Sequence, residues 1–190
     1  MNKFYKLNLL GLERNLPILK APSGIDIAGF NSVGDMKLLT KSAEFLAQKV
    51  KDNNIKCDVL LTTELKGIPI AQELARILNV DYVCLRKQPK CYMLNPTKLS
   101  SESITSGKTE YYISEPELNK LKNNNVVFVD DVFSTGATFI NILNFSNQMN
   151  INIMAGLFIL KEVPKNMING PLDFKFQDKD IYSCGELPLP

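Results

Sequence analysis

Two neighbouring acids and a short hydroxyl-rich loop stand next to each other in the stretch VVFVDDVFSTGAT, residues 126–138. Asp130 and Asp131 follow four apolar residues, and residues 134–138 then offer hydroxyls and backbone N–H groups. Such a loop at the start of a helix binds phosphate, because the helix N-terminus carries partial positive charge. Ionised carboxylates only accept hydrogen bonds and therefore suit neutral hydroxyls. A ligand with vicinal hydroxyls close to a phosphate, such as ribose 5-phosphate, satisfies both groups.

The segments around this stretch alternate between strand and helix patterns. We expect strands over residues 57–63, 81–87, 125–131 and 151–160, and helices over 36–52, 67–79, 114–121 and 137–149. This alternation predicts an α/β fold with a central, mostly parallel, twisted sheet flanked by helices. Ligands of open parallel sheets bind beyond the C-terminal ends of the strands, and Asp130 and Asp131 are expected at such an end.

Composition limits the functions open to the chain. Its 190 residues, 45% of them hydrophobic, fit one domain with a real core. The absence of histidine excludes Ser-His-Asp and Cys-His catalysis and the usual zinc ligand sets. A net charge of +2 argues against nucleic-acid binding, and the apolar run 153–160 is too short to cross a membrane. Four cysteines without a CxxC pair, and an N-terminus without a secretion signal, favour the reduced cytoplasm.

Three regions fall outside the alternation of strands and helices. Residues 1–35 and 164–190 are expected to form a small hood over one end of the sheet, around a core of residues 36–163. Together these parts predict a single domain over residues 1–190. The polar connection within residues 91–113 is long for a compact domain, so we expect a hairpin, a functional lid, or both.

The stretch VVFV-DD-VF-STGAT resembles the phosphoribosyl-pyrophosphate (PRPP) motif of the type I phosphoribosyltransferases: four apolar residues, two acids, a variable pair, then Thr-Gly-x-Thr. The resemblance implies the fold of that family and PRPP as a substrate. It gives Asp130 and Asp131 the ribose 2- and 3-hydroxyls and places Asp131 among the catalytic residues. An acidic pair also ends a strand in receiver domains, but those lack the loop that follows here. By the resemblance, the 5-phosphate is cradled by Ser134, Thr135, Gly136, Ala137 and Thr138.

Two further segments resemble the parts of this family that hold pyrophosphate. The stretch TTELKGIPIA, residues 62–71, is similar to the pyrophosphate loop, whose non-proline cis peptide would join Glu64 to Leu65. The stretch LRKQPK, residues 85–90, is similar to an RK-x-x-K segment of the adenine-using enzymes. Taken alone, these segments are also typical of an ordinary helix start and a solvated charged loop. The residues assigned to pyrophosphate are Glu64, Leu65, Lys66, Gly67, Arg86, Lys87 and Lys90.

The stretch SITSGKTEYY, residues 103–112, resembles the mobile catalytic loop of the family, which closes over PRPP and excludes water. Lys108 would bring a cation to the reaction. Thr105 stands where the adenine enzymes carry a glutamate that exchanges a proton with the base. Either Glu102 or Glu110 takes that role, or a water held by Thr105 does, or the base is not adenine.

The hood segment GIDIAGFN, residues 24–31, resembles more weakly the wall around the base in the purine enzymes. An exposed turn is an equally good interpretation of this segment. The residues assigned to base binding are Ile25, Asp26, Ile27 and Phe30.

These resemblances imply a purine phosphoribosyltransferase, a glycosyltransferase that joins PRPP to a purine base and releases pyrophosphate. Adenine is the first choice of base, with xanthine, hypoxanthine/guanine or orotate as alternatives. The implied cofactor is Mg²⁺, held mainly by PRPP and water rather than by protein side chains. The implied form is a cytoplasmic homodimer without a nucleic-acid or membrane partner. A non-catalytic PRPP-binding regulator is the alternative of another class, but about 35 residues before the first core helix are too few for its DNA-binding domain.

Overall fold

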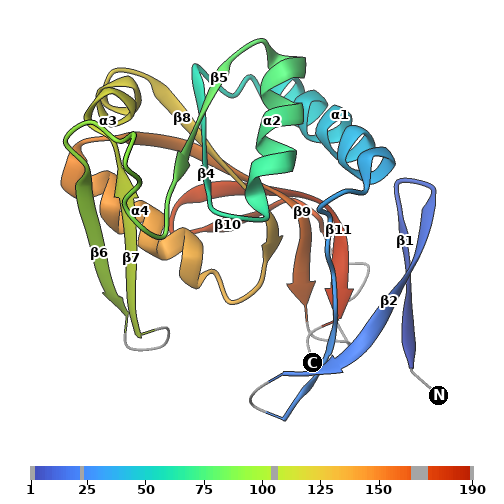
Figure 1. The fold of residues 1–190 in the computed structure, drawn as a ribbon. Helices are drawn as coiled ribbons and strands as arrows, with labels where there is room; N and C mark the ends of the chain where they lie inside the picture. The colour runs from blue at the N-terminus through green and yellow to red at the C-terminus, as the bar shows by residue number, and fades with distance from the viewer. Residues whose placement is uncertain (1–2, 22–23, 104–106, 164–170, 189–190) are drawn as a thin grey trace.

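A six-stranded sheet forms the centre of the protein (Figure 1). The computed structural model describes residues 3–21, 24–103, 107–163 and 171–188. Neighbouring strands follow the order β10-β11-β9-β8-β4-β5, and all neighbours run parallel except β10 and β11. The strands are β4 Val59–Thr63, β5 Asp81–Leu85, β8 Asn125–Phe133, β9 Asn152–Val163, β10 Phe174–Phe176 and β11 Lys179–Pro188. The predicted central, mostly parallel sheet is therefore confirmed.

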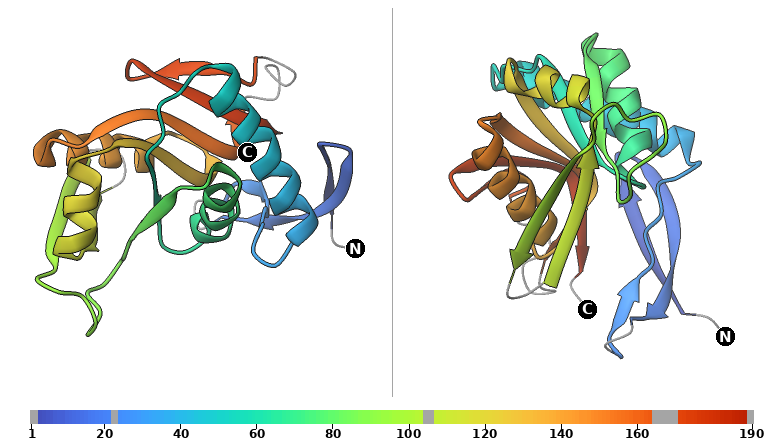
Figure 2. Two further views of the ribbon diagram at one scale, coloured as in Figure 1. Left: turned by 90° about the horizontal axis from the view of Figure 1, so that it is seen from above. Right: turned by 60° about the vertical axis from the view of Figure 1, so that its left-hand side comes forward.

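Helices cover both faces of this sheet (Figures 1 and 2). They are α1 Met36–Asp52, α2 Gly67–Leu78, α3 Glu115–Lys122 and α4 Ala137–Met149. On one face, α1 and α2 pack against side chains such as Val127 and Leu157. On the other, α3 and α4 pack against side chains such as Phe128 and Phe158. Because successive side chains of a strand point to opposite faces, a continuous apolar run such as that of β8 supplies both cores. No helix within the described ranges is long and apolar enough to span a membrane.

The helix α1 occupies the predicted residues for the predicted reasons. Leu39, Ala43, Leu46 and Val50 recur at helical spacing and are all buried. The carboxylate of Asp35 accepts a hydrogen bond from the backbone N–H of Leu38 at 3.2 Å, which caps the first turn. Arg14 of the hood donates to the same carboxylate, so the sequence signal for the helix start also fixes the hood to α1.

The connection between β5 and α3 contains the expected hairpin. Strands β6 Thr97–Ser103 and β7 Gly107–Ile113 pair in antiparallel register. Leu99 and Ile113 are buried in the same core as α3 and α4, so the base of the hairpin is part of the packed structure. The hairpin leads directly into α3, whose capping box of Ser114 and Glu117 also matches the sequence pattern.

The prediction that residues 164–190 belong to the hood is wrong for residues 174–188. The N-terminal strands β1 Phe4–Leu9, β2 Leu12–Lys20 and β3 Asp26–Ala28 form a separate antiparallel sheet. Residues 174–188 instead extend the central sheet as β10 and β11. The four residues 181–184 are all buried, because β11 lies between β9 and β10 and packs on α1. The hood still touches this strand: a Cβ on Gly185 would lie 2.5 Å from Cδ1 of Leu9.

Candidate active site

The two acids of the first motif lie inside β8, which continues two residues beyond the predicted end at 131. Val132 and Phe133 still pair with β9, opposite Leu160 and Lys161. The acids are therefore held by an extended backbone at the C-terminal edge of the sheet, as predicted, but within the strand. Neighbouring strand residues turn to opposite faces, so the two carboxylates meet different surroundings.

Asp131 is buried and paired with a cation. Its side chain keeps 11% of its surface exposed, and its Oδ2 accepts a hydrogen bond from Lys66 Nζ at 3.0 Å. The backbone N–H of Asp131 donates to Oδ1 of Asp130 at 2.9 Å. Burial, and then the negative charge of Asp131, raise the pKa of the Asp130 carboxyl to about 7. Both effects favour the protonated form of Asp130.

Lys66 joins three parts of the molecule. Besides Asp131, its ammonium group donates to the backbone carbonyl of Phe30 in the hood at 3.3 Å. Lys66 itself opens α2, directly after the Glu64–Leu65 peptide, which is cis as the resemblance implied. The predicted pyrophosphate loop, one of the two acids predicted to bind ribose, and the end of the hood thus meet at one side chain.

Gly67 explains how this loop can approach β8 so closely. A Cβ at this position would lie 2.1 Å from Oγ1 of Thr62 and 2.8 Å from Oδ1 of Asp130. Only glycine leaves room for the acid and the loop to meet. The glycine of the predicted pyrophosphate loop therefore has a packing role next to Asp130.

The basic segment after β5 is tied to the same loop. The carboxylate of Glu64 accepts a hydrogen bond from the backbone N–H of Lys87 at 3.0 Å. Arg86 exchanges backbone hydrogen bonds with Tyr112 of the hairpin. The side chain of Lys87 is exposed, those of Arg86 and Lys90 are half-buried, and Leu65 is 63% exposed. These cations lie at the same C-terminal edge of the sheet as the acids and remain candidates for holding an anion there.

The predicted phosphate loop forms the N-terminus of α4. Gly136 is the N-cap and has φ of +77°, a conformation that other residues adopt at a cost. Ser134, Thr135 and Thr138 are exposed, and the loop lines a small cavity of about 70 Å³. A Cβ on Gly136 would lie 2.5 Å from Cζ of Phe176, so β10 packs directly behind the loop. The loop thus exposes hydroxyls at the start of α4 and packs against aromatic rings on its other side.

The remaining predicted residues are less well connected to this centre. In the hood, Phe30 is buried beside Lys66, whereas Ile25 is 49% exposed, Ile27 is half-buried and the carboxylate of Asp26 pairs with Lys20 at 3.2 Å. Their part in base binding stays a prediction. Thr105 lies outside the described residues, and so does the side chain of Lys108, although the backbone of Lys108 belongs to β7.

The sequence patterns did not predict two polar contacts of this region. The hydroxyl of Ser134 donates to the carboxylate of Glu162, near the end of β9. The side chain of Tyr111, on β7, shares a hydrogen bond with Thr63, the last residue of β4. The partners are 28 and 48 residues apart, and no local motif marks either pair. Position alone gave a hint, since Thr63 is the last residue of one predicted strand and Glu162 lies two residues beyond the end of another.

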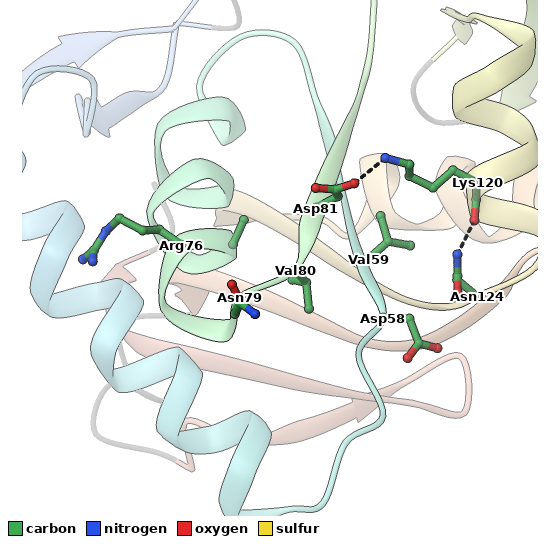
Figure 3. Close-up of a pocket in the computed structure, with 9 residues that line it drawn as sticks. Asp58, Val59, Arg76, Asn79, Val80, Asp81, Lys120 and Asn124 are labelled. Atoms are coloured by element: carbon green, nitrogen blue, oxygen red, sulfur yellow. Dashed lines mark hydrogen bonds and ion pairs between the residues drawn. The ribbon is translucent and has the colours of Figure 1, made fainter.

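A larger hollow of about 520 Å³ lies at the opposite edge of the sheet, where β4 and β5 begin (Figure 3). Its charged groups already have partners: Lys120 donates to Asp81, and Asp58 accepts from the backbone N–H of Asn125 at 2.8 Å. None of the predicted site residues lines it. Size alone therefore does not make it the candidate site.

Comparison with known proteins agrees with this geometry. The model of the phosphoribosyl transferase domain matches residues 31–155, a range that contains the acids and all three loops around them. The chain belongs to this family. In fold it is similar to a solved structure of adenine phosphoribosyltransferase from Thermoanaerobacter pseudethanolicus, with a TM-score of 0.68, 22% identity, and 90% of this chain and 95% of that one covered.

Among curated relatives, the chain is 28% identical to the purine biosynthesis transcriptional repressor PurR of Bacillus subtilis, over 68% of this chain and 44% of the repressor. It is 36% identical to the hypoxanthine/guanine phosphoribosyltransferase of Methanotorris igneus, over 57% of this chain and 55% of that protein. The chain thus spans about half the length of these two relatives. Their names describe an enzyme and a regulator, so family membership leaves both kinds of activity to be considered.

Proposed function

We propose that this protein is a purine phosphoribosyltransferase, which transfers the phosphoribosyl group from PRPP to a purine base and releases pyrophosphate. The observation that carries the proposal is the contact of Lys66 with Asp131 at 3.0 Å. It places a cation of the predicted pyrophosphate loop beside the acids predicted to hold ribose. PRPP carries pyrophosphate and vicinal hydroxyls on adjacent ribose carbons, so its binding site needs these two kinds of group within one ligand length.

In this proposal, the chain's residues orient PRPP and stabilise the charge that develops on it. The loop over residues 134–138 and the N-terminus of α4 hold the 5-phosphate. The carboxylates of Asp130 and Asp131 accept hydrogen bonds from the ribose hydroxyls. Lys66 and the cations after β5 lie on the side of the leaving pyrophosphate, where they stabilise its growing negative charge.

The reaction forms one bond and breaks one bond at C1 of the ribose. A ring nitrogen of the base supplies the electron pair, the C1–O bond to pyrophosphate breaks, and the configuration at C1 inverts. The nitrogen that gains the ribose must lose a proton, and the acceptor of that proton is one of the open assignments of the hairpin. Holding base and PRPP in line is the main contribution of the protein to the rate.

The acids at this edge also offer the carboxylate oxygens that Mg²⁺ prefers. When bound with PRPP, Mg²⁺ would neutralise part of the pyrophosphate charge. Because Lys66 already occupies Oδ2 of Asp131, we propose that most of the metal's ligands come from PRPP and water. A homodimer in the cytoplasm completes the proposal, and it rests on the family resemblance.

Adenine is the first base to test, with hypoxanthine, guanine, xanthine and orotate beside it. The name of the Thermoanaerobacter structure favours adenine and that of the Methanotorris relative favours hypoxanthine or guanine. The experiment mixes purified protein, PRPP and Mg²⁺ with each base and follows nucleotide formation by chromatography. Asp131→Asn should lose most of this activity. Asp58→Asn, at the opposite edge of the sheet, should retain it and serves as the matched control.

A PRPP-binding regulator is the second candidate, because the first curated relative is a transcriptional repressor. Calorimetric titration with PRPP separates the two functions. Tight PRPP binding without nucleotide formation from any of the five bases supports the regulator. If PRPP does not bind at all, both functions are wrong.

A further inference from the structure

One arginine attaches the hood to the residue that precedes α1. Arg14, on β2, donates from Nε and Nη2 to the two carboxylate oxygens of Asp35, at 2.5 and 2.9 Å. A third donor of the same guanidinium group, Nη1, reaches the backbone carbonyl of Glu13 at 2.8 Å. The pair is partly buried, with 30% of the Arg14 side chain and 26% of the Asp35 side chain exposed. A contact through two parallel hydrogen bonds fixes the orientation of the partners as well as their distance.

The strand β2 also holds the other end of the segment that leads from the hood to α1. The backbone N–H of Gly29 donates to the carbonyl of Pro17 at 2.8 Å. A Cβ on Gly29 would lie 2.9 Å from Cδ1 of Leu19 and 3.2 Å from that carbonyl, so this end of the segment packs directly on β2. Residues 29–35 are therefore attached to β2 at both ends, at Pro17 and at Arg14.

Between these two attachments the segment is short and internally bonded. The backbone N–H of Phe30 donates to the carbonyl of Ala28 at 2.8 Å, and that of Asp35 donates to the carbonyl of Ser32 at 3.1 Å. Phe30 is 7% exposed and Ser32 is fully buried. Because the residues between Phe30 and Asp35 are packed and hydrogen-bonded, we expect a displacement of Asp35 to move Phe30.

Phe30 extends this arrangement to the candidate site. Its carbonyl accepts a hydrogen bond from Nζ of Lys66 at 3.3 Å, and the same ammonium group donates to Oδ2 of Asp131 at 3.0 Å. The Lys66 side chain is 49% exposed, so packing alone does not fix its direction. Ordering a lysine side chain costs conformational entropy, and two acceptors that hold the ammonium group reduce that cost for a ligand.

We propose that Arg14 is a positioning residue for PRPP binding. It anchors residues 29–35, and the carbonyl of Phe30 then holds the ammonium group of Lys66 at the pyrophosphate side of the site. The inference rests on the proposed function, because pyrophosphate is the group that Lys66 would meet. It gives an arginine outside every predicted substrate loop a defined effect on substrate affinity.

Two variants release this anchor in different ways. Arg14→Met removes the guanidinium group and keeps an apolar side chain in its place. Asp35→Asn removes the charge of the partner but still caps α1, since asparagine caps helices as well as aspartate does. The matched control is Arg76→Met, because Arg76 makes the same kind of contact with Glu73, at 3.1 and 2.9 Å, on α2. Circular dichroism and thermal unfolding check that each variant is folded.

The first readout needs no substrate. It is the hydrogen exchange of the backbone N–H groups over residues 29–35, measured by mass spectrometry. We expect exchange to be about tenfold faster in Arg14→Met and in Asp35→Asn, since fewer contacts then oppose local opening. Arg76→Met should leave it unchanged. Exchange in Arg14→Met equal to that in the unaltered protein overturns the proposal.

The second readout is the PRPP dissociation constant in the presence of Mg²⁺. Arg14→Met should raise it about three- to tenfold, the usual effect of one lost hydrogen bond. If Arg14 acts through Lys66, the same change should have no further effect in a protein that already carries Lys66→Met. An equal loss of affinity in both backgrounds would mean that Arg14 only supports the fold, and would contradict the positioning role.

A failure of this inference differs from a failure of the proposed function. If PRPP binds to the unaltered protein and binds equally well to Arg14→Met, only the positioning role is wrong. If the unaltered protein does not bind PRPP, the proposed function is wrong, and the role of Arg14 in PRPP binding is wrong with it.

Discussion

Replacing Asp130 by asparagine should make the ligand-free protein more stable above neutral pH. The folded structure raises the pKa of this carboxyl from 3.8 to about 7, mainly through burial and then through repulsion from Asp131. A raised acid pKa means that the folded protein binds the proton more tightly than the unfolded chain does. Stability is therefore lost as pH rises from about 4 to about 7 and stays reduced above that range.

The structure sets the size of this effect. A difference of about three pH units, at about 1.36 kcal/mol per unit, gives an upper limit of about 4 kcal/mol. Asp130 keeps part of its surface exposed, and asparagine also loses the attraction of Lys66. We therefore expect a gain of about 2 kcal/mol at pH 8, which corresponds to about 4–8 °C in melting temperature for a chain of this size.

Thermal unfolding followed by circular dichroism, without PRPP or Mg²⁺, checks this at pH 5, 6, 7 and 8. The difference in melting temperature between Asp130→Asn and the unaltered protein should increase with pH and then level off. Asp58→Asn is a control for which we expect the opposite effect on stability. Hydrogen bonds from Asn125 lower the pKa of the Asp58 carboxyl, so removing this carboxylate should reduce stability at these pH values. A difference in melting temperature that does not change with pH would refute the reasoning. An Asp130→Asn variant less stable than the unaltered protein at pH 8 would refute it as well.

Three further predictions address the loop, the hairpin and a buried ion pair. Gly136→Val should abolish the thermal stabilisation by PRPP, because position 136 has a φ of +77° and a Cβ there would lie 2.5 Å from Phe176. Thr138→Ser is the control. If PRPP raises the melting temperature of the valine variant as much as that of the unaltered protein, the phosphate binds elsewhere. Glu110→Gln should keep at least about a tenth of the turnover, since this carboxylate is paired with Lys98 at 2.9 Å. The loss of a catalytic acid or base would cost about a hundredfold or more. A hundredfold loss with intact PRPP binding would therefore make Glu110 the proton acceptor. Lys161→Met should cost about 3–5 kcal/mol in urea unfolding because it takes the cation from the buried Glu186, 3.2 Å away. Adding Glu186→Leu should restore much of that loss, and a double variant no more stable than Lys161→Met would speak against the ion pair as the cause.

Local patterns were enough to predict most of the core. Asp35 and the apolar spacing of Leu39 to Val50 mark α1, and the apolar run of β8 marks a strand buried on both faces. The acids and glycines of the two predicted substrate loops were recognisable because each loop is a short contiguous motif. The cis peptide at Glu64–Leu65 followed from the same motif.

Contacts between distant segments were not predictable in the same way. Residues 174–188 mix charges, a glycine and a proline, which is typical of a loose tail, yet they form two strands of the central sheet, and residues 181–184 are buried there. Tyr111 and Glu162 reach the site only because the hairpin and β9 end beside it. Such pairs depend on how strands are ordered in space, and one sequence carries no direct signal of that order.

The aromatic side chains packed behind the predicted phosphate loop have a consequence for folding during synthesis. Phe133, in the strand before the loop, packs edge-to-face against Phe174 and Phe176, with ring centroids 5.2 and 5.1 Å apart. Those two rings are synthesised about forty residues after the loop that they support, counting from Gly136 to Phe176. During translation the acids and the first turns of α4 emerge well before β10 exists, and long-range pairing of this kind forms slowly. A nascent chain that stops before residue 174 would contain every residue of the phosphate motif without the wall that shapes it.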